Sequence, residues 1–272
     1  RPNIPGKTAP KSPTPRIPNL HHPKPPLQTR ATHNPQPKAS ALMILCCGEA
    51  LIDMIPTDLA GGGTGFAPHA GGAIFNTAVA LGRLNAKVGM LSGVSTDGFG
   101  TLLADRLREN GVDTAHLIRS DRLTTLAIVH LIDGQATYSF YDEGAAGRML
   151  TEADMPTLGY EVKTLYFGGI SLVSPPAADA YAALLEAAHD SRIVMLDPTI
   201  RPGFITDEAA YRARLGQMLS RADIVKVSDE DLAWITGGQG EIAAQAEQLR
   251  DMGPRCVVEA LGAEGAIVGG AG

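Results

Sequence analysis

The sequence predicts an α/β fold with a mainly parallel β-sheet that helices cover on both faces. Apolar runs of strand length alternate with segments of helical periodicity along most of the chain. Such alternation is typical of βαβ units, whose crossover helices pack on the sheet. One pair of neighbouring strand-like runs breaks the alternation and indicates a small antiparallel appendage.

Residues 1–42 differ in composition from the rest of the chain. They are rich in Pro and carry Lys and Arg but no Asp or Glu. A segment of this kind buries too little apolar surface to offset its chain entropy. We therefore predict a disordered basic tail, or translated sequence upstream of a start at Met43, followed by a single domain over residues 43–272. A polyproline-type arm that docks a partner is the alternative.

The overall composition excludes several classes of protein. Of the 272 residues, 44% are hydrophobic and 19% are charged, and the net charge of −6 argues against a nucleic-acid surface. No apolar stretch is long enough to suggest a membrane span. The three cysteines lack the spacing of a zinc site and are too few for a disulfide framework, which favours a cytoplasmic protein.

The individual elements follow from their apolar patterns. Strands are expected at 42–55, 86–94, 162–172, 191–198, 222–228 and 255–262. Helices are expected at 75–85, 99–111, 177–190, 211–222 and 242–253. Two β-rich runs, 124–132 and 136–141, flank a short Asp-Gly turn and predict a hairpin.

Polar residues gather where the predicted strands end. Ligands of open parallel sheets bind at the carboxyl ends of the strands. This rule selects Asp53, Ser95–Asp97, Gly169–Ser171, Asp197–Arg201 and Lys226–Asp231. A further candidate is the pair Gly71 and Gly72 before a helix that carries Asn76, because glycines let a backbone approach a ligand closely.

Several motifs in order resemble those of the ribokinase-like (PfkB) carbohydrate kinases, and their combination is similar to bacterial fructokinases. The motifs are "GEALIDMIP", "AGGAIFNTAVALGRL", "FYDEGAAGRML", "LDPTIRPGFI" and "ADIVKVSDEDL". The resemblance implies a three-layer α/β/α ribokinase-like fold with a small β lid. It also implies transfer of the γ-phosphoryl group of ATP to a sugar hydroxyl, with Mg²⁺ and with K⁺ as a further expected ion. Homodimer formation through the lid is a further expectation.

The resemblance assigns substrate roles to seven residues. Asp53 is expected to accept hydrogen bonds from sugar hydroxyls, and a solvated loop carboxylate is the alternative. Arg201 is expected to neutralise a phosphoryl oxygen, or instead to form a salt bridge. The full set is Asp53, Gly71, Gly72, Asn76, Phe140, Asp197 and Arg201. Asp142 and Gly147 stand where many relatives have Arg and Asp, which favours a neutral sugar.

Nucleotide contacts are expected further along the chain. Lys226, Ser228, Gly262 and Gly265 match positions near the nucleotide phosphates. Asp231 stands where the family has Glu and is expected to reach the metal through water. Ser228 and the acids after it are also expected to cap the helix that follows. Thr199 replaces the usual Asn, and Ala260 replaces the usual Thr.

The catalytic base of the family, the Asp of a Gly-Ala-Gly-Asp motif, has no counterpart before Gly272. We therefore expect a C-terminally truncated fructokinase-like chain of low activity. A non-catalytic sugar-binding protein is one alternative, and a kinase of 2-keto-3-deoxygluconate, ribose or a nucleoside is another. The run of glycines at 61–65 does not indicate a dinucleotide site, because Pro68 and His69 stand where its helix should begin.

Overall fold

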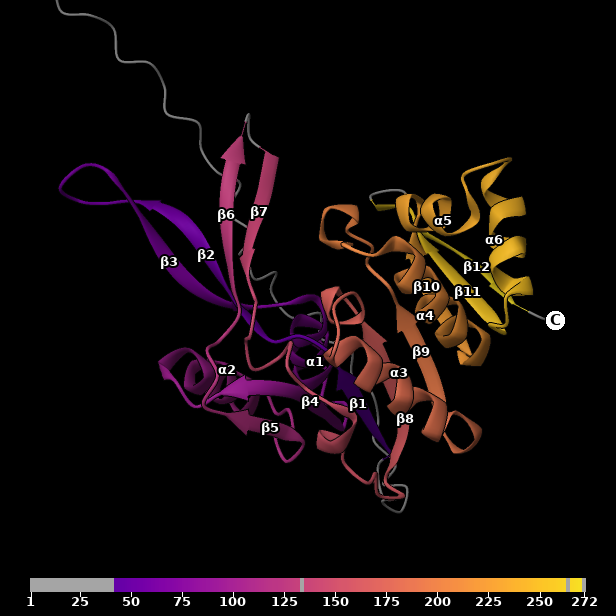
Figure 1. Cartoon of the computed structure of the whole chain (residues 1–272), viewed down its shortest axis with the longest axis horizontal. Coiled ribbons are helices and arrows are strands. Elements are labelled where there is room, and N and C mark those ends of the chain that lie inside the picture. Colours follow the sequence, from indigo (N-terminus) through magenta and orange to yellow (C-terminus); the bar gives the residue numbers. More distant parts are fainter. Residues whose placement is uncertain (1–41, 133–134, 263–264, 271–272) are drawn as a thin grey trace, which may run out of the picture. The chain divides into compact units, whose positions relative to one another are not determined.

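A computed structural model describes residues 42–132, 135–262 and 265–270 (Figure 1). The tail predicted for residues 1–42 lies outside the described residues, apart from Leu42, and so does the Asp-Gly turn at 133–134. Within the described part, the predicted α/β class and its mainly parallel sheet are confirmed.

The described residues form a large sheet of eight strands in the order β12-β11-β10-β9-β8-β1-β4-β5. Neighbouring strands are parallel except for the antiparallel pair β11 and β12. The strands are β1 (Met43–Cys47), β4 (Val88–Ser95), β5 (Leu117–Ser120), β8 (Val162–Gly168), β9 (Ile193–Asp197), β10 (Ile224–Ser228), β11 (Cys256–Ala260) and β12 (Ala266–Gly270).

Helices cover both faces of this sheet (Figure 1). The helices are α1 (Ala73–Arg83), α2 (Gly98–Glu109), α3 (Ala177–Ala188), α4 (Glu208–Arg221), α5 (Asp229–Thr236) and α6 (Ile242–Asp251). Successive strand residues point to opposite faces. Leu45 and Cys47 accordingly belong to the apolar core under α3 to α6, and Cys46 between them belongs to the core under α1 and α2. The result is the predicted three-layer arrangement.

A second sheet of four strands has the order β3-β2-β6-β7. Its strands are β2 (Leu51–Asp58), β3 (Thr64–Gly71), β6 (Leu126–Ile132) and β7 (Gln135–Tyr141). Strands β6 and β7 are antiparallel, as predicted, and β6 pairs in parallel with β2 (Figure 1). The small antiparallel appendage of the sequence therefore contains two hairpins rather than one.

The single strand predicted over 42–55 is wrong. The chain leaves the large sheet after Cys47 and enters the small sheet at Leu51. Gly48 marks this break: a Cβ at this position would stand 2.5 Å from Ile74 Cγ1. Hydropathy does not reveal the break, because strands of both sheets are apolar here.

Strand β3 was not predicted. It follows a turn in which Gly62 and Gly63 have φ values of 84° and 92°, and it pairs antiparallel with β2 from Leu51 to Asp58. The glycine run therefore forms a hairpin turn, consistent with its rejection as a dinucleotide motif. The Pro and Gly residues of β3 hide its strand character from propensity.

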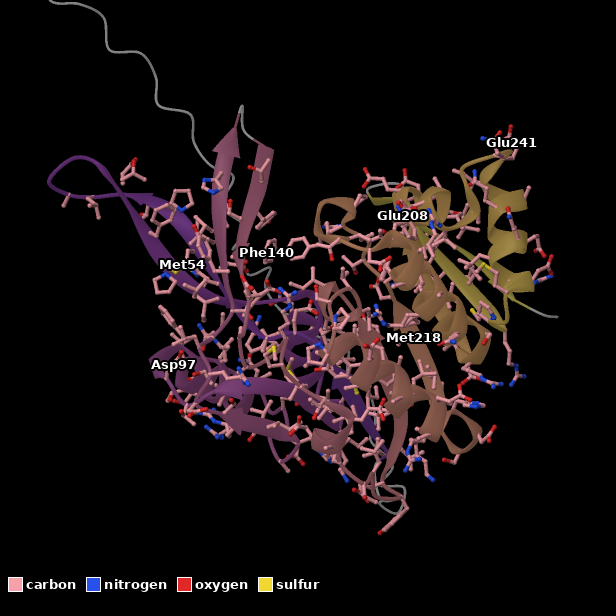
Figure 2. The ribbon with its side chains drawn as sticks, viewed as in Figure 1. Met54, Asp97, Phe140, Glu208, Met218 and Glu241 are labelled. Atoms are coloured by element: carbon pink, nitrogen blue, oxygen red, sulfur yellow. The ribbon has the colours of Figure 1, made fainter. Side chains whose placement is uncertain are left out.

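Helix α2 begins at a side chain that also fixes a distant segment. Asp97 is the N-cap, and its Oδ1 accepts hydrogen bonds from Gly100 N at 2.7 Å and from Thr124 Oγ1 at 2.8 Å (Figure 2). Its Oδ2 accepts from Thr124 N at 3.1 Å. Burial alone raises the pKa of Asp97, but these hydrogen bonds outweigh burial and hold the pKa below the ordinary value of 3.8.

We predict that Asp97→Ala lowers the free energy of unfolding by about 1 kcal/mol at pH 7, because an N-cap is lost. A depressed carboxyl pKa contributes stability that is present above pH 4 and is lost as the pH falls through the folded-state pKa. The difference between wild type and variant should therefore shrink below pH 4 in urea titrations. Asp105→Ala, which removes an exposed carboxylate of the same helix, is the control. A difference that stays constant with pH would contradict this account.

Candidate functional site

A cavity of about 550 Å³ lies beside the small sheet, at the carboxyl ends of β8 and β9. Its volume is in the range of small-molecule sites. The cavity is lined by Glu49, Leu51, Asp53, Gly72, Ala73, Asn76, Tyr138, Phe140, Gly169, Ile170, Thr199, Arg201, Pro202, Gly203 and Phe204. Five of the seven predicted substrate residues are in this set. Gly71 and Asp197 do not line the cavity, but each lies against a lining residue: Gly71 against Asp53, and Asp197 against Thr199.

Asp53 lies inside β2 of the small sheet, opposite His69 of β3. The prediction that Asp53 follows a strand of the large sheet is wrong. The chain changes sheets after Cys47, before it reaches Asp53. Burial raises the pKa of Asp53, and the nearby His69 partly offsets this shift. Among the described residues, none donates a hydrogen bond to its carboxylate. The carboxylate is therefore available to accept hydrogen bonds from a ligand.

The start of α1 forms another wall of the cavity. Gly72 is the N-cap, with a φ of 108°, and Asn76 is exposed one turn further on. Gly71 is the last residue of β3, and a Cβ there would collide with the carboxylate of Asp53. The two glycines thus let α1 begin close to Asp53.

Aromatic side chains close the cavity on the side of the small sheet. Phe140 of β7 packs edge-to-face on Phe204 of the turn before α4, with ring centroids 4.2 Å apart (Figure 2). Tyr138 lies two residues before Phe140, on the same face of the strand. The alternation of side chains along a strand predicts that Tyr138 and Phe140 share a face. Neither Tyr138 nor Phe204 was identified as a candidate from the sequence. The Phe140–Phe204 contact joins the small sheet to the large one.

Asp197, at the end of β9, is the centre of a buried polar network. It accepts hydrogen bonds from Tyr166 Oη at 3.1 Å and Thr199 Oγ1 at 3.1 Å. Lys226 Nζ lies 3.1 Å from Asp197 Oδ2. Lys226 was predicted to approach nucleotide phosphates, and here its ammonium group is paired with a carboxylate. Asp197 is 8% exposed, and its carboxylate contacts three donor side chains, those of Tyr166, Thr199 and Lys226.

The segment after β9 carries Arg201 into the cavity lining. Arg201 is exposed, and its Nη1 donates to the carbonyl oxygen of Ile200 at 3.0 Å. No salt bridge to it is seen among the described residues, so the alternative of a paired structural arginine lacks support. Thr199 beside it has a φ of 45°, a left-handed conformation that is costly for a β-branched residue.

Ser228 and Asp231 form a capping box at the start of α5, as the capping alternative predicted. Ser228 Oγ accepts from Asp231 N at 3.1 Å, and Asp231 Oδ2 accepts from Ser228 N at 3.3 Å. Asp231 Oδ1 accepts from Ile200 N at 2.8 Å. Both oxygens of Asp231 are therefore used, and the side chain holds the segment that precedes Arg201.

Gly262 and Gly265 lie in the turn between β11 and β12, with φ values of 58° and 105°. The two strands are antiparallel, and Ala260 pairs with Ala266 at the end of the ladder next to the turn. This is the strand-turn-strand unit expected from the sequence. Residues 263–264 lie outside the described residues.

Glu49 is a cavity residue that sequence reasoning missed. It lies between β1 and β2, is 9% exposed, and accepts hydrogen bonds from the start of α1 and from Ser171 N. Burial raises the pKa of Glu49, and these hydrogen bonds partly counteract the shift. The available signal was a carboxylate within the apolar run 42–55, since a buried charge requires partners.

Asp142, one of the two positions that differ from the family pattern, pairs with Arg148, which follows the other position, Gly147. Arg148 Nη1 lies 3.1 Å from Asp142 Oδ1. Arg148 does not line the 550 Å³ cavity, in which Arg201 is the one cationic side chain among two carboxylates. A positive charge is thus present near this position, but it is neutralised by Asp142.

The described residues contain no group of three or more His, Cys, Asp or Glu side chains placed to hold a metal ion. They do not build a metal site of their own. None of the helices in this part of the chain combines the length and the apolar character needed to cross a bilayer.

The structure is that of an α/β protein with a cavity of small-molecule size at the carboxyl ends of parallel strands, where ligands of open α/β sheets bind. A family model described as "pfkB family carbohydrate kinase" matches residues 41–272. The chain belongs to the pfkB family of carbohydrate kinases. Membership implies a reaction that uses ATP and a metal ion.

Individual relatives agree with this assignment. A fructokinase of Rhizobium leguminosarum bv. trifolii is 51% identical over 224 residues, which are 82% of this chain and 68% of the relative. The fructokinase of Xylella fastidiosa with bound ATP superposes with a TM-score of 0.74 at 28% identity and covers 84% of this chain and 77% of its own.

A fructokinase of Vibrio cholerae O395, solved in a fructose, ADP and calcium ion bound form, also has a TM-score of 0.74. It is 26% identical and covers 85% of this chain and 74% of its own. The chain spans 68% of the length of the Rhizobium relative and 58–65% of that of seven plant relatives.

We predict that Thr199→Asn raises the free energy of unfolding by roughly 1 kcal/mol, because Asn tolerates a positive φ that strains a β-branched residue. Thr199→Val keeps the branch but loses the hydrogen bond to Asp197, and it should lower the stability by about 1 kcal/mol. Urea unfolding of the three proteins checks both. A Thr199→Asn variant no more stable than wild type would show that strain at this residue is negligible.

Proposed function

We propose that this protein transfers the γ-phosphoryl group of ATP to a hydroxyl of fructose. The observation that carries the proposal is the cavity beside the small sheet. The carboxylate of Asp53 lies there beside Gly71, just before α1, and accepts no hydrogen bond from the described residues. The similarity to fructokinases, one of them solved with fructose and ADP, supports fructose as the acceptor.

The charge of the cavity supports a neutral sugar. Two carboxylates, Glu49 and Asp53, and the single cation Arg201 line it. An anionic sugar acid would meet net repulsion in this environment. In the proposal, Asp53 and Asn76 bind sugar hydroxyls, and Phe140 excludes water from the reacting groups. Arg201 stabilises negative charge on the transferred phosphoryl group.

The nucleotide is proposed to bind toward β10 and β11. Lys226, Ser228 and the turn at Gly262 and Gly265 are the candidate contacts. The metal ion, proposed to be Mg²⁺, would be held by the ATP phosphates. Asp231 would contribute through water, in addition to the hydrogen bonds that its two oxygens already accept from Ile200 N and Ser228 N. K⁺ is a further proposed ion.

Two further aspects belong to the proposal. A homodimer through the small sheet is supported by exposed apolar side chains on its face away from the cavity: Phe66 is 46% and Tyr141 is 65% exposed. A cytoplasmic location is supported by Cys46, Cys47 and Cys256, all of which are free thiols.

The proposal predicts that the full-length protein releases ADP with fructose, and more slowly with ribose, 2-keto-3-deoxygluconate or a nucleoside, in a coupled assay. Asp53→Asn should raise the KM for fructose about 10- to 100-fold, because charge-assisted hydrogen bonds contribute about 1.5–3 kcal/mol. The KM for ATP should stay within twofold.

Asp58→Asn, at the exposed end of the same strand, is the matched control and should behave as wild type. Absence of ADP release with every sugar would refute the kinase activity, and calorimetric binding of fructose without turnover would instead support a sugar-binding protein. Equal KM values for the two variants would remove Asp53 from the site.

A further inference from the structure

Glu49 connects three segments that meet at the cavity. It lies between β1 and β2, and its carboxylate contacts α1 and the turn after β8. Each of these segments contributes residues to the cavity lining. The side chain is 9% exposed, so its charge is largely removed from water.

The contacts of Glu49 are directional and involve both carboxylate oxygens. Oε1 accepts from Ala73 N at 2.8 Å and from Ile74 N at 3.4 Å. Oε2 accepts from Ser171 N at 3.4 Å. The backbone oxygen of Glu49 accepts from Phe75 N at 3.2 Å. Three of the first amides of α1, which have no partner within the helix, are thereby satisfied by one residue.

The backbone around Glu49 is shaped to admit its side chain. A Cβ at Gly72 would stand 2.9 Å from the carbonyl oxygen of Glu49, and a Cβ at Gly169 would collide with its carboxylate. Both glycines have positive φ values, 108° and 70°. Since Gly72 and Gly169 also line the cavity, the fit around Glu49 sets the shape of the wall that a ligand meets.

Helix α1 supplies no side-chain cap of its own at its N-terminus. Its N-cap residue is glycine, which offers no side-chain cap, and the first turn holds no acidic residue. The carboxylate of Glu49 therefore supplies both the missing acceptor and the negative charge that the helix N-terminus favours.

We propose that Glu49 is a positioning residue for the sugar: it fixes the start of α1, and so Asn76 and the Gly72 backbone, without touching the sugar itself. The proposal rests on the proposed function of this cavity. The geometry assigns the residue a role in sugar affinity rather than in nucleotide binding, since all its contacts lie on the sugar side of the site.

The test compares wild type with Glu49→Gln and, as a matched control, Asp207→Asn, which alters the N-cap of α4. In Glu49→Gln the amide NH₂ group faces an N–H donor. We expect a fructose KM at least tenfold higher, with the KM for ATP within twofold. A purely structural role would instead lower activity per milligram without this split, and that result would overturn the proposal.

A second readout does not depend on turnover. Without any ligand, the amides of Ala73, Ile74 and Ser171 should exchange hydrogen faster in Glu49→Gln than in wild type or Asp207→Asn. Unchanged exchange would refute the role of Glu49 even if the protein is a fructokinase. Faster exchange in a protein that phosphorylates no sugar would support the anchoring but refute the proposed function.

A second variant, Gly169→Ala, also tests the role of Glu49. Gly169→Ala keeps the carboxylate but places a methyl group against it, so it should displace Glu49 and raise the fructose KM in the same direction. Because Gly169 itself lines the cavity and has a positive φ, the KM of this variant is read together with hydrogen exchange at Ala73 and Ile74, which reports displacement of Glu49. A wild-type KM in folded Gly169→Ala would overturn the proposal.

Discussion

The buried carboxylate of Glu49 is the interaction on which the geometry of the cavity depends. It accepts hydrogen bonds from Ala73 N and Ser171 N, which belong to segments about 100 residues apart in the chain. Breaking either contact would leave a buried charge with fewer hydrogen-bond donors, a costly state that favours the observed arrangement. The Gly72 and Gly169 conformations are consequences of this packing.

A second set of buried polar contacts organises the carboxyl ends of the neighbouring strands. Asp197 of β9 binds Tyr166 of β8 and Lys226 of β10, while Asp231 of α5 holds Ile200 N. These contacts fix the segment that carries Arg201 relative to the proposed nucleotide side. The two carboxylates thus act here as structural acceptors, and a ligand phosphate would compete with Asp197 for Lys226.

The sequence predicted the inner strands of the large sheet well, because they are largely buried and stand out as apolar runs. It missed the edge strand β5, none of whose residues is fully buried. It did not predict the change of sheets after Cys47, since Gly48 interrupts an apolar run whose two halves look alike. Strand β3 was missed because Pro68 and its glycines have low β-propensity. Glu49 and Phe204 were missed because their roles depend on partners far away in sequence, which periodicity does not report.

The most direct test of this account is a crystal structure of the protein with fructose bound. We predict that fructose occupies the cavity of about 550 Å³, with its hydroxyls within hydrogen-bonding distance of Asp53 and Asn76. Glu49 should keep its contacts with Ala73 N and Ser171 N and should not touch the sugar. Fructose bound at another surface, or bonded directly to the carboxylate of Glu49, would contradict the account.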